Sequence, residues 1–206
     1  MKVLVIGSHP DDFEYGCGGT LLKLKQKGAR INVLIMTKGE FGGKAEIREK
    51  EQEKVCRILN ARLYWGDFID TQISLSKELI NKIEDVIEIT APNLIFVHYP
   101  EDTHQDHRNV AQATITATRY IRNVLFYESP SSINFSPSVF MDIGDVLQRK
   151  LKLLEIHKSQ INSTKVKKLS ITEGATSCAI FRGYQTRVKY AEGFKSLRLS
   201  LDFWLK

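Results

Sequence analysis

The 206-residue chain lacks several features that would assign it to common protein classes. No apolar run approaches the roughly 20 residues that a membrane-spanning helix needs. Charge interrupts the first residues, MKVLVIGSHPDD, too soon for a secretory signal, so we expect a cytoplasmic protein. The three cysteines, Cys17, Cys56 and Cys178, are far apart, which argues against a disulfide framework and favours reduced, packed thiols.

Familiar nucleotide and nucleophile motifs are also missing. Gly7 ends the first apolar run but is followed by SHPDD, so the dinucleotide-binding pattern G-x-G-x-x-G is absent. The chain has no P-loop, no G-x-S-x-G elbow and no cysteine paired with a nearby histidine. Function therefore has to be sought in other polar residues.

Charge is unevenly distributed along the chain, whose net charge is +6. Residues 1–145 carry 17 Lys and Arg against 20 Asp and Glu, whereas residues 146–206 carry 13 against 4. A basic C-terminal quarter could attract nucleic acid or an anionic substrate. Its basic residues are spaced like solvated helix faces and lack interleaved aromatics, so we expect no nucleic-acid and no membrane partner.

Apolar runs and helical periodicities alternate through most of the chain, as in an α/β protein. Short buried strands are predicted at 2–7, 31–36, 63–65, 94–98, 123–127 and 138–143. Helices are predicted at 17–27, 44–59, 75–90, 107–119 and 144–159. We expect a Rossmann-like, mostly parallel sheet with helices on both faces, in one domain over 1–206. Residues 160–206 are the least readable, with a helix and a strand near 187–191 expected there.

Two polar clusters follow strand-like runs. His9-Pro10-Asp11-Asp12 comes after strand 2–7, and His104-Gln105-Asp106-His107 comes shortly after strand 94–98. In open parallel sheets, ligands bind beyond the carboxyl ends of the strands. If the two strands are neighbours, the clusters meet in one crevice. Two imidazoles and a carboxylate would then make a zinc site with a position left for water, and spare carboxylates could act as a base.

Each cluster alone has a simpler interpretation. The first could be a helix-entry turn, with Asp as a cap and Pro setting the backbone, and the second an exposed helix start. Three of the five histidines lie in these two short segments, which surface placement does not predict. Of the other two, His98 either lines the crevice floor or simply ends a strand. His157 lies on a charged helix, and we expect it to be solvated.

The segments HPDDFEYGCGGT and HYPEDTHQDHRNV together resemble those of the LmbE-like (PIG-L) zinc-dependent N-acetylglucosaminyl deacetylases. Two later stretches, FSPSVFMDIGDVLQRKLKLLEIHKSQ and FRGYQTRVKYAEGF, are similar to bacterial members, so the resemblance runs along nearly the whole chain. It implies a Rossmann-like sheet, a catalytic Zn²⁺ and hydrolysis of the acetamide of an N-acetylglucosamine-type sugar or its conjugate. Fe²⁺ also suits histidine and carboxylate ligands.

The same resemblance implies a role for individual residues. The positions of the metal ligands are matched by His9, Asp12 and His107. Asp11 matches the general base, His104 the histidine that faces the substrate carbonyl, and Asp106 its acidic neighbour, which would orient an imidazole. Substrate binding is implied for one residue outside the two clusters, Arg48.

The expected partner is thus a small amino-sugar substrate, and relatives of this kind favour a homo-oligomer, with the aromatic end LDFWLK as a possible contact. Three alternatives stay open. The same site could hydrolyse a non-sugar N-acyl substrate. The chain could be a binding module with a structural metal, although structural zinc sites are usually closed by four protein ligands. It could also bind nucleic acid or a membrane surface through its basic quarter.

Overall fold

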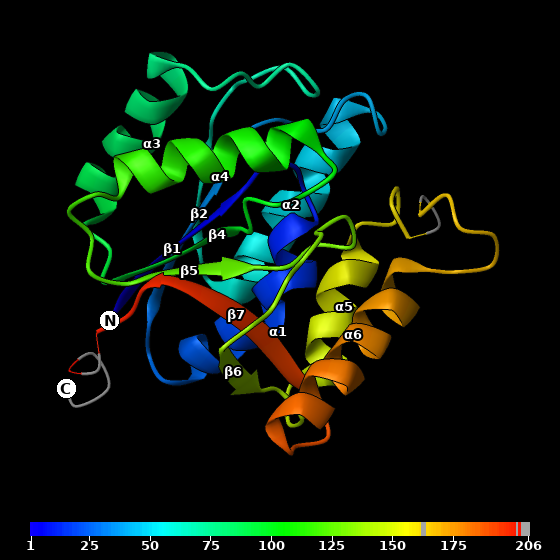
Figure 1. Cartoon of the computed structure of the whole chain (residues 1–206). Helices are drawn as coiled ribbons and strands as arrows, with labels where there is room; N and C mark the ends of the chain where they lie inside the picture. Colours follow the sequence, from blue (N-terminus) through cyan, green and yellow to red (C-terminus); the bar gives the residue numbers. More distant parts are fainter. Residues whose placement is uncertain (162–163, 201, 203–206) are drawn as a thin grey trace.

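One seven-stranded sheet organises the chain in the computed structural model, which describes residues 1–161, 164–200 and 202 (Figure 1). The expected contact through LDFWLK falls mostly outside these residues. The strands are β1 (Lys2–Gly7), β2 (Arg30–Ile35), β3 (Arg62–Trp65), β4 (Leu94–His98), β5 (Val124–Tyr127), β6 (Val139–Asp142) and β7 (Ala191–Arg198). The helices are α1 (Asp12–Gln26), α2 (Ala45–Leu59), α3 (Lys77–Thr90), α4 (Gln105–Ala117), α5 (Leu147–Ile156) and α6 (Ile171–Thr186).

The strand order is β3-β2-β1-β4-β5-β7-β6, and the first five strands run parallel. The last two add an antiparallel edge, because β7 pairs antiparallel with both β5 and β6. The chain passes outward from β1 through β2 to β3 and then returns to place β4 on the other side of β1. The order therefore reverses between β1 and β4, the position where open α/β sheets bind ligands. The predicted fold class is confirmed.

Helices cover both faces of the sheet, as Figure 1 shows: α3 and α4 lie on one face, and α1, α2 and α5 on the other, with α6 packed beside α5 and β7. Alternate residues of β1 point to opposite faces, as the pleat requires. Val3 and Val5 join the core beneath α1 and α2, whereas Leu4 and Ile6 join the core beneath α3 and α4. Both faces of the sheet are buried along β1, which explains why this strand is a continuous apolar run.

Helix α1 begins earlier than predicted, at Asp12 instead of 17, because tertiary packing overrides the poor helix propensity of its glycines. A Cβ at Gly16 would lie 2.2 Å from Cδ2 of Tyr127, and one at Gly19 would lie 2.8 Å from Ile143. The glycines thus let α1 approach the sheet closely. The glycine-rich segment is therefore a helix that runs directly out of the first polar cluster.

The C-terminal part also differs in detail from the prediction. Strand β7 spans Ala191–Arg198 and not 187–191. The helix expected in this part of the chain is α6. Helix α6 starts with a full capping box between Ser170 and Glu173. No helix among the described residues is long and apolar enough to cross a membrane.

Candidate metal centre

The two polar clusters meet at the carboxyl ends of β1 and β4, which are paired in parallel. One ligand atom from each of His9, Asp12 and His107 lies within 4.8 Å of the other two. All three residues are largely buried, with 5 to 8% of their surface exposed. The prediction that the two clusters meet is confirmed, because the strand order places β1 and β4 side by side.

Asp12 is oriented by the turn that precedes α1. Its Oδ2 accepts the backbone N–H groups of Ser8 and His9, at 3.0 and 2.7 Å. Its Oδ1 is directed toward His107, whose Nε2 is 3.4 Å away. The turn therefore occupies one carboxylate oxygen and leaves the other for a ligand in the crevice.

His107, in the first turn of α4, is held from behind by a carboxylate that the sequence analysis did not identify. Its Nδ1 lies 3.2 Å from Oδ2 of Asp102, an ion-pair contact that favours, whenever the ring is neutral, the proton on Nδ1 and the lone pair on Nε2. Burial lowers the pKa of His107, but Asp12 and Asp102 outweigh burial and raise it to about 9. Asp102 is itself held by the Ser129 hydroxyl, at 2.5 Å.

His9 has the same arrangement with its ring nitrogens exchanged. Its Nε2 lies 3.0 Å from Oδ1 of Asp70 and 3.2 Å from Oδ2 of Asp106, and its Nδ1 lies on the Asp12 side. Burial works against the protonated ring, yet Asp106, Asp12 and Asp70 raise the pKa of His9 well above its usual value. Each imidazole thus presents one nitrogen to the crevice, while a buried carboxylate holds the other.

This donor set fits a divalent cation. Two imidazole nitrogens and one carboxylate oxygen converge. Without a metal, nearby carboxylates keep both imidazole rings protonated, which shows that the site favours positive charge. His9, His104 and Asp106 form a second group of close donors. In that group Nδ1 of His104 accepts the N–H of Asp106 at 3.3 Å, which places the proton of the neutral ring on Nε2. The second group is therefore less suited to a metal.

Asp11 is not among the converging donors although it adjoins Asp12. It is the N-cap residue of α1, but its side chain makes no capping hydrogen bond, and its backbone is left-handed, with φ at 90°. Burial raises the pKa of Asp11 to about 6, and the guanidinium of Arg48, whose Nη2 is 3.7 Å from Oδ1, opposes the rise. A carboxyl group with this pKa can exchange a proton near neutral pH.

His104 and Asp106, expected to act together, are placed on different neighbours. The ring of His104 stacks on His107, with centroids 4.7 Å apart, and burial followed by the charge of His107 lowers its pKa. His104 is therefore neutral, with an Nε2–H group to donate. Asp106 is fully buried, contacts His9 and accepts the N–H of Thr71 at 2.8 Å. The imidazole that Asp106 contacts is thus that of His9.

Arg48 is buried beside the first cluster. It donates to the carbonyl oxygens of Gly39 and Pro10, both at 2.8 Å, while its Nε has no hydrogen-bond partner among the described residues. A Cβ at Gly39 would lie only 2.1 Å from Nη1, so the glycine lets the loop fold around the guanidinium. Arg48 therefore joins this loop to the residue that precedes Asp11.

The remaining two histidines have distinct positions. His98 ends β4 and lies against the converging donors: it is fully buried, stacks on His107 at 4.0 Å and places Nε2 3.1 Å from Asp12. Burial lowers its pKa to about 4, so this ring stays neutral. The prediction for His157 is wrong, because the residue is 1% exposed and its Nε2 lies 3.0 Å from Glu14. Helical periodicity placed it on a charged face, but it follows the end of α5.

Sequence reasoning missed two carboxylates of the site. Asp102, two residues before His104, carried a local signal, because it belongs to the same acidic and histidine-rich segment. Asp70 carried none, since it lies on the loop after β3 and is separated from His9 by 60 intervening residues. Only the path of that loop brings it to the crevice.

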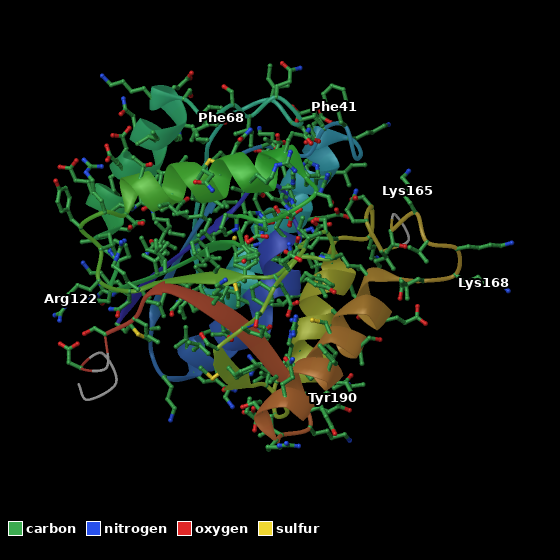
Figure 2. The ribbon with its side chains drawn as sticks, in the orientation of Figure 1. Phe41, Phe68, Arg122, Lys165, Lys168 and Tyr190 are labelled. Carbon is green, nitrogen blue, oxygen red and sulfur yellow. The ribbon has the colours of Figure 1, made fainter. Side chains whose placement is uncertain are left out.

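Other surface features lie apart from this site. A hollow of about 860 Å³ opens at the opposite end of the sheet, lined by Met1, Asn93 and Asn123 among others, and none of the predicted site residues lines it. Figure 2 shows Lys165 and Lys168 extending away from the body of the molecule, on the segment between α5 and α6. These basic residues thus lie apart from the crevice.

Comparison with known proteins adds to this geometry. A family model described as PIG-L, GlcNAc-PI de-N-acetylase, matches residues 4–118, from β1 to the end of α4. An uncharacterised deacetylase of Escherichia coli K12, YaiS, is 36% identical over 76% of this chain and 90% of its own length. The diacetylchitobiose deacetylase of Thermococcus kodakarensis is 31% identical over 77% of this chain and 70% of its own.

Solved structures are similar over a longer stretch. The N,N′-diacetylchitobiose deacetylase of Pyrococcus horikoshii, in complex with an inhibitor, has a TM-score of 0.84 and 26% identity, covering 98% of this chain and 88% of that one. The crystal structure of a 4-carboxy-2-hydroxymuconate hydratase of Pseudomonas putida is also similar, with a TM-score of 0.83 and 21% identity, covering 97% of this chain and 97% of that one. Similarity of the whole fold therefore extends to more than one kind of reaction.

Proposed function

Because this chain belongs to the PIG-L family, we propose that it is a zinc-dependent deacetylase that hydrolyses the acetamide of an N-acetylglucosamine-type sugar or its conjugate. The convergence of His9, Asp12 and His107, with Asp11 excluded from the ligand set, carries this proposal. Three ligands leave a position for solvent or substrate, which is typical of catalytic zinc sites.

The proposed mechanism divides the work among neighbouring side chains. When bound, the cation supplies a Lewis acid that polarises the amide carbonyl and makes the attacking water more acidic. Asp11 accepts the proton of this water, which a pKa near 6 allows at neutral pH, and then donates it to the leaving amine. His104 donates its Nε2–H to the oxygen on which negative charge develops. Arg48 is the proposed substrate-binding residue.

Buried carboxylates keep the two ligand rings in the required tautomers. Asp106 orients the ring of His9, and Asp102 orients that of His107. Asp11 and Asp12 take different roles in this mechanism because only Asp12 belongs to the converging donors, while Asp11 lies beside Arg48. A carboxylate that binds the metal cannot also serve as the free base.

Three variants test these roles. Asp11→Asn should keep one metal per chain, measured by mass spectrometry of the purified protein, and lower kcat by about 10²- to 10⁴-fold. His107→Ala should lose the metal, and His104→Ala should lower kcat with metal content unchanged. Asp85→Asn, at an exposed position on α3, is the matched control and should change neither quantity. Near-normal kcat in Asp11→Asn would show that the base is another group.

The substrate is tested by a panel comprising free N-acetylglucosamine, N,N′-diacetylchitobiose, a thiol-linked N-acetylglucosaminide and UDP-N-acetylglucosamine, with acetate release as the readout. Turnover of a non-sugar N-acyl amide in preference to all four would support the alternative amidohydrolase. A metal-loaded protein that deacetylates nothing would overturn the deacetylase proposal.

We further propose a homo-oligomer in which residues 1–206 form one functional domain, and sedimentation velocity tests the oligomeric state.

A further inference from the structure

Asp11, the proposed base, has a strained backbone conformation. Asp11 has φ at 90° and ψ at −17°, a left-handed conformation that residues other than glycine seldom adopt. Its side chain does not compensate by capping α1. Such a conformation costs free energy and persists only where the surrounding structure fixes it. The contacts on either side of Asp11 therefore decide where its carboxylate points.

The first support acts through Glu14, in the first turn of α1. Glu14 is fully buried, and its Oε1 accepts Nε2–H of Gln52, on α2, at 2.9 Å. The same oxygen lies 3.0 Å from Nε2 of His157, which follows α5. The first turn of α1 is thus connected to α2 and to the residue that follows α5.

The second support acts through Arg48, which bonds the carbonyl oxygen of Pro10, the residue before Asp11. The guanidinium is enclosed by the loop at 39–43, because a Cβ at Gly42 would lie 2.7 Å from its Nη1. Gln160 donates to the carbonyl oxygen of Gly42 at 3.1 Å and so holds this loop. Phe41, on the same loop, is labelled at the edge of the molecule in Figure 2.

Both supports are held by one short segment, residues 157–160, which we call the clasp. His157 contacts Glu14, and Gln160 holds the loop around Arg48. Between the two ends of the clasp, Ser159 bonds the carboxylate of Glu51, on α2, through its N–H at 3.1 Å and its hydroxyl at 2.6 Å. The clasp therefore contacts α1, α2 and the loop at 39–43. It lies outside residues 4–118, which match the family model.

Stability alone does not account for the buried part of this arrangement. Oε2 of Glu14, Oε1 of Gln52 and Nδ1 of His157 are buried and have no hydrogen-bond partner among the described residues. Buried polar atoms without partners are destabilising, and an apolar cluster of the same shape would avoid this cost. A function that needs the polar contacts explains their presence better.

We propose that the clasp is a positioning element that holds Asp11 in its left-handed conformation beside the metal centre, through Glu14 on one side and Arg48 on the other. The proposal rests on the proposed function, in which Asp11 is the base. The side chains of His157, Ser159 and Gln160 thus act as positioning groups, and none of them touches the reacting atoms. Misplacement of a catalytic group by about 1 Å is enough to cost 10²-fold in rate.

The test compares His157→Leu and Gln160→Ala with Lys158→Ala, an exposed matched control within the clasp. In the zinc-loaded enzyme, the first two should lower kcat by about 10- to 100-fold while KM and metal content stay within twofold. Lys158→Ala should match the wild type. His157→Gln should recover much of the loss, because its amide can donate to Glu14. Unchanged kcat in a folded His157→Leu or Gln160→Ala variant would overturn the proposal, as would metal loss parallel to the fall in kcat.

Hydrogen exchange supplies a readout that does not depend on turnover. Peptides spanning residues 8–16 should exchange faster in His157→Leu than in wild type, whereas peptides from α3 should not change. Unaltered exchange at 8–16 would overturn the clasp even if kcat fell. If the wild-type protein shows no deacetylase turnover, the proposed function fails, but faster exchange at 8–16 would still support the clasp. Should His157→Leu fail to fold, Gln160→Ala carries both measurements, with Lys158→Ala as its control.

Discussion

Replacing Asp102 by asparagine should weaken metal binding by about 10- to 100-fold, or roughly 1.4–2.7 kcal/mol, although Asp102 is not a proposed ligand. The amide oxygen of the new residue should take the place of Oδ1, which accepts the backbone N–H of His104 at 2.9 Å. Its NH₂ group then faces Nδ1 of His107, at the position of an oxygen now 3.2 Å away. Two donors cannot face each other, so the ring should adopt the other tautomer. That tautomer carries its proton on Nε2, the nitrogen on the Asp12 side, and so cannot bind the cation through it.

The assay is a competition titration of Zn²⁺ against a chromophoric chelator at pH 7. Ser132→Ala is the matched control, because it removes a hydroxyl 3.2 Å from the same carboxylate oxygen while leaving the Asp102–His107 contact. It should change affinity by less than about threefold, because Ser129 still holds Asp102 and the Asp102–His107 contact is unchanged. Wild-type affinity in Asp102→Asn would refute the tautomer argument.

Two further predictions concern protons and packing. Binding of Zn²⁺ at pH 7 should release about two protons, because carboxylates keep His9 and His107 protonated in the metal-free protein; calorimetric enthalpies that do not depend on the buffer would contradict this. The charged ring of His107 should stabilise the metal-free fold fully below pH 6.5, and this contribution should vanish as pH rises through about 9; urea unfolding at several pH values measures it. Gly16→Ala should lower the free energy of unfolding by about 1–3 kcal/mol, because its Cβ would collide with Tyr127. Gly18→Ala should be neutral or mildly stabilising, because its Cβ would lie in ordinary contact, 3.6 Å from Cγ of Lys150. Equal melting temperatures for the two variants would contradict the packing argument.

The core strands and the two polar clusters were predictable because their signals are local. A buried parallel strand is a short apolar run, and the residues that follow it lie at the carboxyl edge of the sheet whatever the rest of the chain does. Prediction failed where tertiary contact reverses a local preference. Glycines disfavour a helix at 12–19, yet close packing on Tyr127 and Ile143 favours one. His157 lies among charged residues, yet Glu14 draws it into the interior.

The amino-acid sequence alone determined the fold class, the placement of ligand-type side chains after β1 and β4, and the presence of two adjacent aspartates in the first cluster. Tertiary structure decided which carboxylate holds which imidazole and what fixes the backbone at Asp11. Asp70 reaches His9 from a loop after β3, and His157 reaches Glu14 from beyond α5. The reason is physical: apolar periodicity and residue type act over a few positions, whereas contacts between loops depend on strand order and chain path. The candidate ligands could therefore be named from the sequence, whereas the orientation of their side chains could not.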